Sequence, residues 1–173
     1  ILVSDVDLNR VKWTPIAKGS AFLGVFDGGN NTISNLTTTD PDCAGFFWSA
    51  RNVKNLTLKN VKISGNFKAG AISGDGLCST FDNCHVDGGT IVSTPREVNG
   101  VMDDGNNVGG ITGYLSAEPN ASITNCSVKN VTLKAFRTIG GLVGKMQGAS
   151  CNVKGNTVEN VEIIANMTTP GYP

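Results

Sequence analysis

The stretch Val53-Lys-Asn-Leu-Thr-Leu-Lys-Asn-Val-Lys-Ile63 carries the pattern from which we predict the fold. Leu56 and Leu58 alternate with polar residues, and so do the two apolar residues that end the stretch. One extra residue separates these two pairs, and another separates Val53 from the first pair. Strict alternation would send half of the apolar side chains into water. Extra residues that bend the chain would instead return the apolar face of each short strand to a shared interior.

The same pattern recurs along the chain, which is typical of a solenoid. Three further clear copies occupy residues 81–91, 123–133 and 153–163, and two degenerate copies occupy residues 3–13 and 33–43. The repeat therefore predicts a stack of about six coils.

The residues at the two breaks support bends at fixed positions. Apart from one Arg, all of them are Asn, Asp or Gly, which tolerate left-handed or turn conformations. The first break holds Asp5, Asn35, Asn55, Asn83, Asn125 and Gly155, and the second holds Arg10, Asp40, Asn60, Gly88, Asn130 and Asn160. We expect the Asn side chains of the first break to stack and hydrogen-bond along the axis of the coil.

A Gly-flanked segment precedes the clearest copies and is predicted to be the third strand of each coil. It reads Gly70-Ala-Ile-Ser-Gly74, Gly109-Gly-Ile-Thr-Gly113 and Gly140-Gly-Leu-Val-Gly144, with Ala44-Gly-Phe-Phe-Trp48 as an imperfect relative. Small residues there would let backbones approach closely at a crowded corner. The predicted fold is an all-β, right-handed parallel β-helix with three short strands per coil. A β-sandwich would not repeat Asn or Gly at the same two offsets.

Composition limits the classes of function. The 173 residues carry 14 basic and 14 acidic side chains, a neutral balance that argues against nucleic acid as a partner. The apolar runs are too short for insertion into a membrane. Five Cys without a CxxC pair and one His argue against a metal site, and no cofactor is expected. Buried free thiols are the simpler interpretation, with Cys84 and Cys126 as stacked neighbours, and a disulfide between these two is the alternative. Because Ile1 falls inside a strand pattern, we expect residues 1–173 to be a single β-helix domain from a longer chain.

The Gly-flanked segments carry a family resemblance. Gly141-Leu-Val-Gly144 and Gly110-Ile-Thr-Gly113 resemble the GLUG motif of bacterial surface proteins, which include some IgA peptidases. The opening stretch, from Asp5-Val-Asp-Leu8 through Phe22-Leu-Gly-Val-Phe-Asp-Gly28, is similar to the segment that commonly precedes such repeats. The resemblance implies an extracellular, adhesin-like protein of the bacterial cell surface. It implies no protease, since the repeats are not the catalytic part of those peptidases and the HExxH motif is absent.

Two outward rows of side chains bear on the question of catalysis. One runs Lys59, Asp87, Lys129, Glu159 through successive coils, and the other runs Thr57, His85, Ser127, Thr157. The first alternates in sign, which avoids repulsion between lateral neighbours. Neither row brings together the two carboxylates that glycoside hydrolysis normally needs. A surface role for His85 is expected.

The candidate binding residues lie mainly in an insertion. Residues 92–107 lengthen one coil, and long loops on a rigid scaffold are where function concentrates. Arg96, Glu97, Asp103 and Asp104 are the predicted ligand-binding residues of this inserted loop, although a merely tolerated loop is the simpler explanation. Trp48 replaces a Gly of the other copies and is a candidate for stacking on sugar, with packing as the alternative.

The sequence therefore predicts a non-enzymatic β-helix that acts as an adhesin-like segment or a rigid spacer. Surface glycan or a host extracellular protein is the expected partner, besides the rest of its own chain. Two alternatives stay open. One is a polysaccharide-active lyase or hydrolase, which would need acids from adjacent coils to converge, and the other is a purely structural stalk.

Overall fold

The computed structural model describes residues 1–99, 101–103, 106–118, 120–148 and 150–165, and these residues form β-strands and turns without a helix. The strands are β1 (Val6–Asp7), β2 (Lys12–Trp13), β3 (Phe22–Ser34), β4 (Thr37–Asp40), β5 (Cys43–Ala44), β6 (Phe47–Gly65), β7 (Lys68–Gly70), β8 (Ser73–Leu77), β9 (Thr80–Ser93), β10 (Arg96–Val98), β11 (Val101–Asp103), β12 (Asn107–Gly109), β13 (Thr112–Ala117), β14 (Ser122–Thr124), β15 (Ser127–Ala135), β16 (Thr138–Gly140), β17 (Val143–Gly148), β18 (Asn152–Lys154), β19 (Thr157–Glu159) and β20 (Glu162–Ala165).

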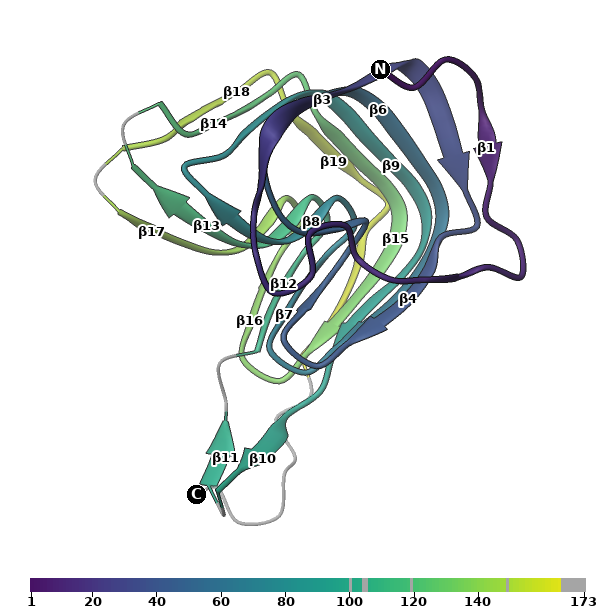
Figure 1. Ribbon diagram of the computed structural model, residues 1–173. Coiled ribbons are helices and arrows are strands. Elements are labelled where there is room, and N and C mark those ends of the chain that lie inside the picture. Colours follow the sequence, from purple (N-terminus) through teal and green to yellow (C-terminus); the bar gives the residue numbers. More distant parts are fainter. Residues whose placement is uncertain (100, 104–105, 119, 149, 166–173) are drawn as a thin grey trace.

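The strands stack in three parallel groups (Figure 1). The curved sheet contains β3, β6, β9 and β15 as nested arcs, with shorter strands at both ends of the stack. The β7 sheet contains β5, β7, β12 and β16, and the β8 sheet contains the start of β6 followed by β8, β13 and β17. The chain visits the three groups in turn, so each repeat adds one layer, as in a solenoid.

The register of the curved sheet confirms the repeat from the third copy onward. Leu58 lies opposite Val86, which lies opposite Val128, which lies opposite Val158. Because equivalent residues pair directly, apolar side chains of successive coils stack in the interior, where the first three of these four are fully buried. The interior is close to continuous along the stack.

The predicted corners are left-handed at most positions. Asn55, Asn83 and Asn125 at the first corner have φ between 50° and 55°, and Asn60, Asn130 and Asn160 at the second have φ between 50° and 55°. The amide of Asn83 donates to Asn55 Oδ1 at 2.9 Å, so this part of the predicted Asn row is confirmed. Asn125 departs from it, since its amide donates to Asp82 at 3.1 Å.

The predicted register of the first two copies is wrong. Ile33 lies opposite Leu58, not opposite Val53, and Phe26 is the residue that faces Val53. Asn35 therefore belongs to the second corner, where its N–H donates to Lys59 O at 2.9 Å. The cause is an irregularity between Asp27 and Asn31 that widens the first corner of β3. The sequence after Ile33 happens to repeat the spacing after Val53, which hid this shift.

The Gly-flanked segment is a turn between two strands and not a strand, so that prediction is also corrected. β7 ends at Gly70 and β8 begins at Ser73, with Ile72 fully buried between them. A Cβ on Gly113 would lie 2.5 Å from the backbone nitrogen of Ala69, so only Gly fits this corner. Conversely, β6 and β9 run through both predicted corners of the curved sheet without interruption.

Aromatic residues fill the interior at the N-terminal end. The Trp13 ring stacks on Phe46 with centroids 4.9 Å apart, and its Nε1 donates to Phe46 O at 2.9 Å. Trp13 also shares a row with Ile63 through Thr38, so its predicted place in the core or cap is confirmed. At the other end, Val153 and Ile163 of the last described coil are about half exposed, at 48% and 53%.

The five Cys residues are free thiols, and Cys84 and Cys126 are buried in the interior as predicted. Contact with the Cys126 thiol, followed by burial, raises the pKa of Cys84. The interior thiols are therefore packing groups.

Candidate binding groove

Within the predicted loop, the described residues of β10 and β11 form an antiparallel pair, called here the hairpin. β10 pairs with β11 so that Arg96 faces Asp103 and Glu97 faces Met102. The hairpin projects beyond the stack near the end of the β7 sheet (Figure 1). The side chains of Glu97 and Asp103, and the whole of Asp104, lie outside the described residues.

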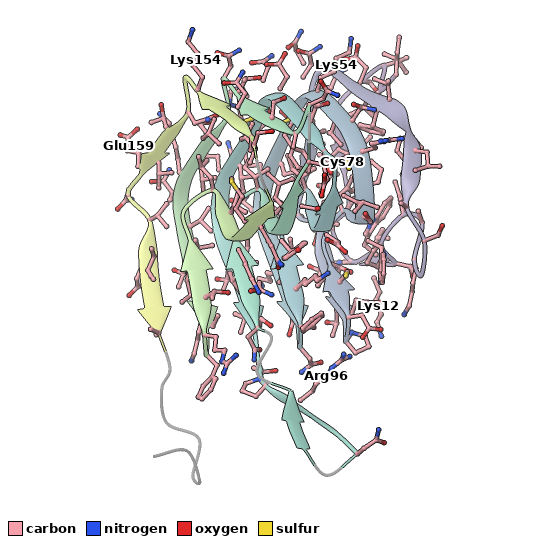
Figure 2. The ribbon with its side chains drawn as sticks, turned by 90° about the vertical axis from the view of Figure 1, so that its left-hand side faces the viewer. Lys12, Lys54, Cys78, Arg96, Lys154 and Glu159 are labelled. Carbon is pink, nitrogen blue, oxygen red and sulfur yellow. The ribbon has the colours of Figure 1, made fainter. Side chains whose placement is uncertain are left out.

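Arg96 stands at the base of the hairpin (Figure 2). Its guanidinium forms an ion pair with Asp42, donates to Pro41 O at 3.3 Å and lies 5.4 Å from the centre of the Phe67 ring. These contacts fasten the hairpin to the coils. The role of Arg96 in ligand binding stays a prediction.

Trp48 lies in another sheet from the hairpin. Because Ser49 pairs with Asp75, Trp48 lies beside Gly74 of the neighbouring strand. The sequence predicts this place, in the row where the other copies have Gly. The backbone N–H of Trp48 donates to Ile16 O at 2.9 Å, and the side chain of Trp48 is half-buried. Stacking on sugar stays a prediction for this residue.

The two outward rows have the predicted register. Lys59, Asp87, Lys129 and Glu159 are direct neighbours, and Lys129 Nζ lies 2.8 Å from Glu159 Oε2. The hydrogen bond and the charge of Glu159 raise the pKa of Lys129. Acids on this face bind separate partners, since Glu162 accepts instead from Thr132 at 3.1 Å.

His85 of the other row has two hydrogen-bonding partners, one in the same row and one at the first corner. Its Nδ1 lies 2.8 Å from Ser127 Oγ, and its Nε2 lies 3.0 Å from Asn83 Oδ1. Both nitrogens are thus engaged by neutral side chains of the sheet, an arrangement that holds the ring on the surface.

The structure contains a groove that the sequence reasoning missed. The β7 and β8 sheets meet at the Gly turns and diverge from there, leaving an open angle on the outside of the stack (Figure 1). A pocket of about 360 Å³ lies in this angle. It is lined by Phe67, Lys68, Asn107, Tyr114, Arg137, Thr138, Lys145 and Gln147. We call this the corner groove.

Two rows of side chains form the walls of the corner groove. In the β7 sheet, Lys68, Asn107 and Thr138 are neighbours. In the β8 sheet the row is Asp75, Tyr114, Lys145. The pocket therefore crosses strands of successive coils, which stack about 4.8 Å apart.

One end of the corner groove is closed by an ion pair. Lys68 Nζ lies 2.8 Å from Asp75 Oδ2 and 4.5 Å from the centre of the Tyr114 ring. The Tyr114 hydroxyl donates to Gln147 Oε1 at 3.2 Å. Cys43 lies beside this end. Burial and, to a smaller extent, the charge of Asp75 raise the pKa of its thiol to about 12.

Fixed offsets from the Gly turns locate these wall residues in the sequence. Each β7-sheet residue stands two positions before the first Gly of a turn, and each β8-sheet residue stands one position after the last Gly. Lys68 and Asp75 flank Gly70-Ala-Ile-Ser-Gly74 in this way, as Asn107 and Tyr114 flank the next turn. The sequence contains these offsets. They indicate a groove only when the Gly segment is recognised as a turn whose flanking residues face each other.

The described part of the chain contains neither a group of three or more His, Cys, Asp or Glu placed to hold a metal ion nor a helix suited to crossing a membrane. What the corner groove offers chemically is charge, amide and hydroxyl groups and aromatic surface.

Comparison with known proteins gives two similarities, and no family model matches the chain. An immunoglobulin A1 protease of Streptococcus sanguinis is 34% identical over 137 residues, which cover 76% of this chain and 6% of that protein. The chain thus spans a small fraction of the relative it matches. A crystal structure of a Bacteroides ovatus protein, provisionally named an immunoglobulin A1 protease, matches with a TM-score of 0.52 and 15% identity. That match covers 99% of this chain and 72% of the other, and it supports the fold alone.

Proposed function

We propose that this chain forms a right-handed parallel β-helix on the outside of a bacterial cell and binds an extracellular ligand as a non-enzymatic, adhesin-like segment. The observation that carries the proposal is the corner groove. It is a preformed pocket of about 360 Å³, within the size range of small-ligand sites, on the outer surface of a rigid stack.

The similarity to the Streptococcus sanguinis protein supports an extracellular bacterial setting. The resemblance of the Gly turns to the GLUG motif of bacterial surface proteins agrees with this setting. A proteolytic role has no support in the sequence itself. The chain contains one His, whereas the HExxH metal-binding motif requires two.

Binding is better supported than polysaccharide cleavage. The carboxylate beside the corner groove, Asp75, is held by Lys68 at 2.8 Å. On the curved sheet, Glu159 binds Lys129 and Glu162 binds Thr132, so these two acids are directed to different neighbours. A hydrolase would instead place two carboxyl groups around one bond, about 5–10 Å apart.

A binding screen tests the proposal. The purified chain would be applied to an array of neutral and acidic glycans and of extracellular matrix proteins. A variant lacking residues 94–105 and a variant with a blocked groove, Thr138→Trp, would be applied beside it. Binding to at least one array component is expected, with loss in the groove variant if the groove is the site and in the loop deletion if the hairpin is.

Two results would contradict the proposal. Wild-type protein that binds nothing on the array would favour the purely structural stalk. Release of reducing ends from polysaccharides, abolished by Asp75→Asn or Glu159→Gln, would favour the enzyme.

A further inference from the structure

Resting on the proposed function, we infer that the corner groove binds an acidic saccharide, with its carboxylate or sulfate group placed against Lys145 and Arg137. The groove is more basic than the rest of the protein. Three of its lining side chains, those of Lys68, Arg137 and Lys145, are cationic and none is acidic, and Lys68 pairs with Asp75 beside the pocket. The chain as a whole has a formal charge of zero. The excess of positive charge is therefore local.

Lys145 is the cation best placed for a ligand. It is exposed, follows Tyr114 in the β8-sheet row, and makes no ion pair with any residue whose position the structure describes. Arg137 lines the same pocket on the side of Thr138. An ammonium and a guanidinium around one pocket suit a carboxylate or sulfate, because the guanidinium binds two oxygens at once.

The neutral groups of the groove suit the hydroxyl groups of a sugar. Gln147 accepts from the Tyr114 hydroxyl through Oε1, which leaves its NH₂ group to donate to a ligand. The Thr138 hydroxyl has one proton, for which Asn106 O at 3.0 Å and Asn107 Oδ1 are the acceptors, and its oxygen keeps the capacity to accept. The Tyr114 ring adds a flat apolar surface of the kind that pairs with the apolar face of a sugar.

The shape of the groove also favours a chain of sugars over a single anion. Its walls are rows from successive coils, so a linear ligand can lie along the stack and meet a new pair of residues at each coil. Nucleic acid is a poor alternative, since its affinity comes from many basic residues in a stripe and this site has few. An acidic peptide would share the negative charge of the ligand. Its acidic side chains lack the hydroxyl groups that the amide and hydroxyl side chains of the groove would bind.

The probe that tests the inference is an oligogalacturonate of about six units, whose carboxylates can be removed by methyl esterification. Binding of the acid form, the ester form, a sulfated oligosaccharide and an oligoglutamate would be measured by calorimetry at low and high salt. We expect the acid or the sulfated form to bind at least about tenfold more tightly than the ester, with affinity falling as salt rises. The two charged forms distinguish carboxylate from sulfate recognition.

Matched variants locate the site. Lys145→Gln is expected to weaken binding about tenfold, and the double variant with Arg137→Gln more. Lys154→Gln, an exposed Lys at the top of the molecule in Figure 2, should bind as wild type does. Circular dichroism would verify that each variant is folded. A Lys145→Met variant gives a second reading if the Gln variant does not fold.

The results separate this inference from the proposed function. Equal binding of ester and acid forms, binding unchanged in both Lys145 variants, or stronger binding to oligoglutamate would overturn the inference while leaving a binding protein. Binding of a neutral glycan alone on the array would do the same. A protein that binds no array component and none of these probes would overturn both.

Discussion

Lys68 and Asp75 face each other across a buried turn, with Lys68 Nζ 2.8 Å from Asp75 Oδ2 and the two side chains only 17% and 20% exposed. They come from different sheets, so the pair ties the β7 sheet to the β8 sheet at the head of the corner groove. The ring of Tyr114 lies 4.5 Å from the same nitrogen and adds to its stabilisation.

Removal of this pair is predicted to destabilise the protein. Asp75→Asn leaves the Lys68 ammonium partly buried without its counter-ion, and we expect a loss of about 1–2 kcal/mol in the free energy of unfolding. Urea denaturation would measure it. Lys129→Gln, which breaks an exposed pair on the curved sheet, is the control and should cost clearly less. Similar losses in both variants would show that solvent screens the corner pair as well.

The left-handed corners give a second prediction, at Asn55. Its φ of 53° disfavours residues with a Cβ, and its amide donates to Asp27 Oδ1 at 3.1 Å. We expect Asn55→Gly to be more stable than Asn55→Ala by about 1 kcal/mol, with both below wild type. At Lys62, an exposed strand position, the Gly variant should instead be less stable than the Ala variant. The same order at both positions in thermal unfolding would contradict a left-handed corner.

The stacked interior gives a third prediction. Leu58 is fully buried between Ile33 and Val86, so Leu58→Asp would place a charge in a dry interior at a cost of several kcal/mol. We expect loss of the native circular dichroism spectrum and no cooperative melting transition. The neighbouring variant Lys59→Gln points outward and should melt as wild type does. A normal transition for Leu58→Asp would mean that this row faces water.

Much of the stack could be predicted from the sequence because corners and apolar positions recur at fixed offsets. Wherever the corner holds one residue, as at Asn83 and Asn125, the predicted neighbours pair as expected. The prediction failed at Asp27–Asn31, where the corner holds two extra residues and the local pattern gave no sign of the shift. The register between successive coils depends on the number of residues in each corner, and the periodicity of the sequence alone does not give that number.

The corner groove could not be predicted for a related reason. The sequence predicts a strand for Gly70-Ala-Ile-Ser-Gly74, and a strand there would place Lys68 and Asp75 far from each other. In the structure the segment turns sharply around the buried Ile72, and the flanking side chains come to face each other. Loop length points to Arg96 as a candidate, but it does not reveal the ion pair with Asp42, which depends on how the hairpin folds onto the coils.

The Gly corners give a fourth prediction. A methyl group on Gly113 would lie 2.5 Å from Ala69 N and 2.8 Å from Asn107 O, both backbone atoms that cannot move independently. Gly113→Ala should therefore cost about 1–3 kcal/mol or more and disturb the corner groove. Gly24→Ala is the matched control, because its nearest neighbour is the side chain of Phe22 at 3.1 Å. Equal melting temperatures for the two variants would contradict a crowded corner.

Acid should weaken the first corner through Asp27. The N–H of Gly29 and then the amide of Asn55 donate to this carboxylate, with Lys54 nearby, and they hold its pKa below the ordinary value of 3.8. Because the folded-state pKa is the lower one, Asp27 contributes stability above pH 3.8, and the contribution disappears as the pH falls through the folded-state value. Unfolding free energies of wild type and Asp27→Asn should therefore converge as the pH is lowered from about 6 to about 2. Glu118→Gln, which alters an exposed carboxyl away from the corners, is the control. A difference between wild type and Asp27→Asn that stays constant over this range would mean that the carboxylate charge of Asp27 does not hold the corner.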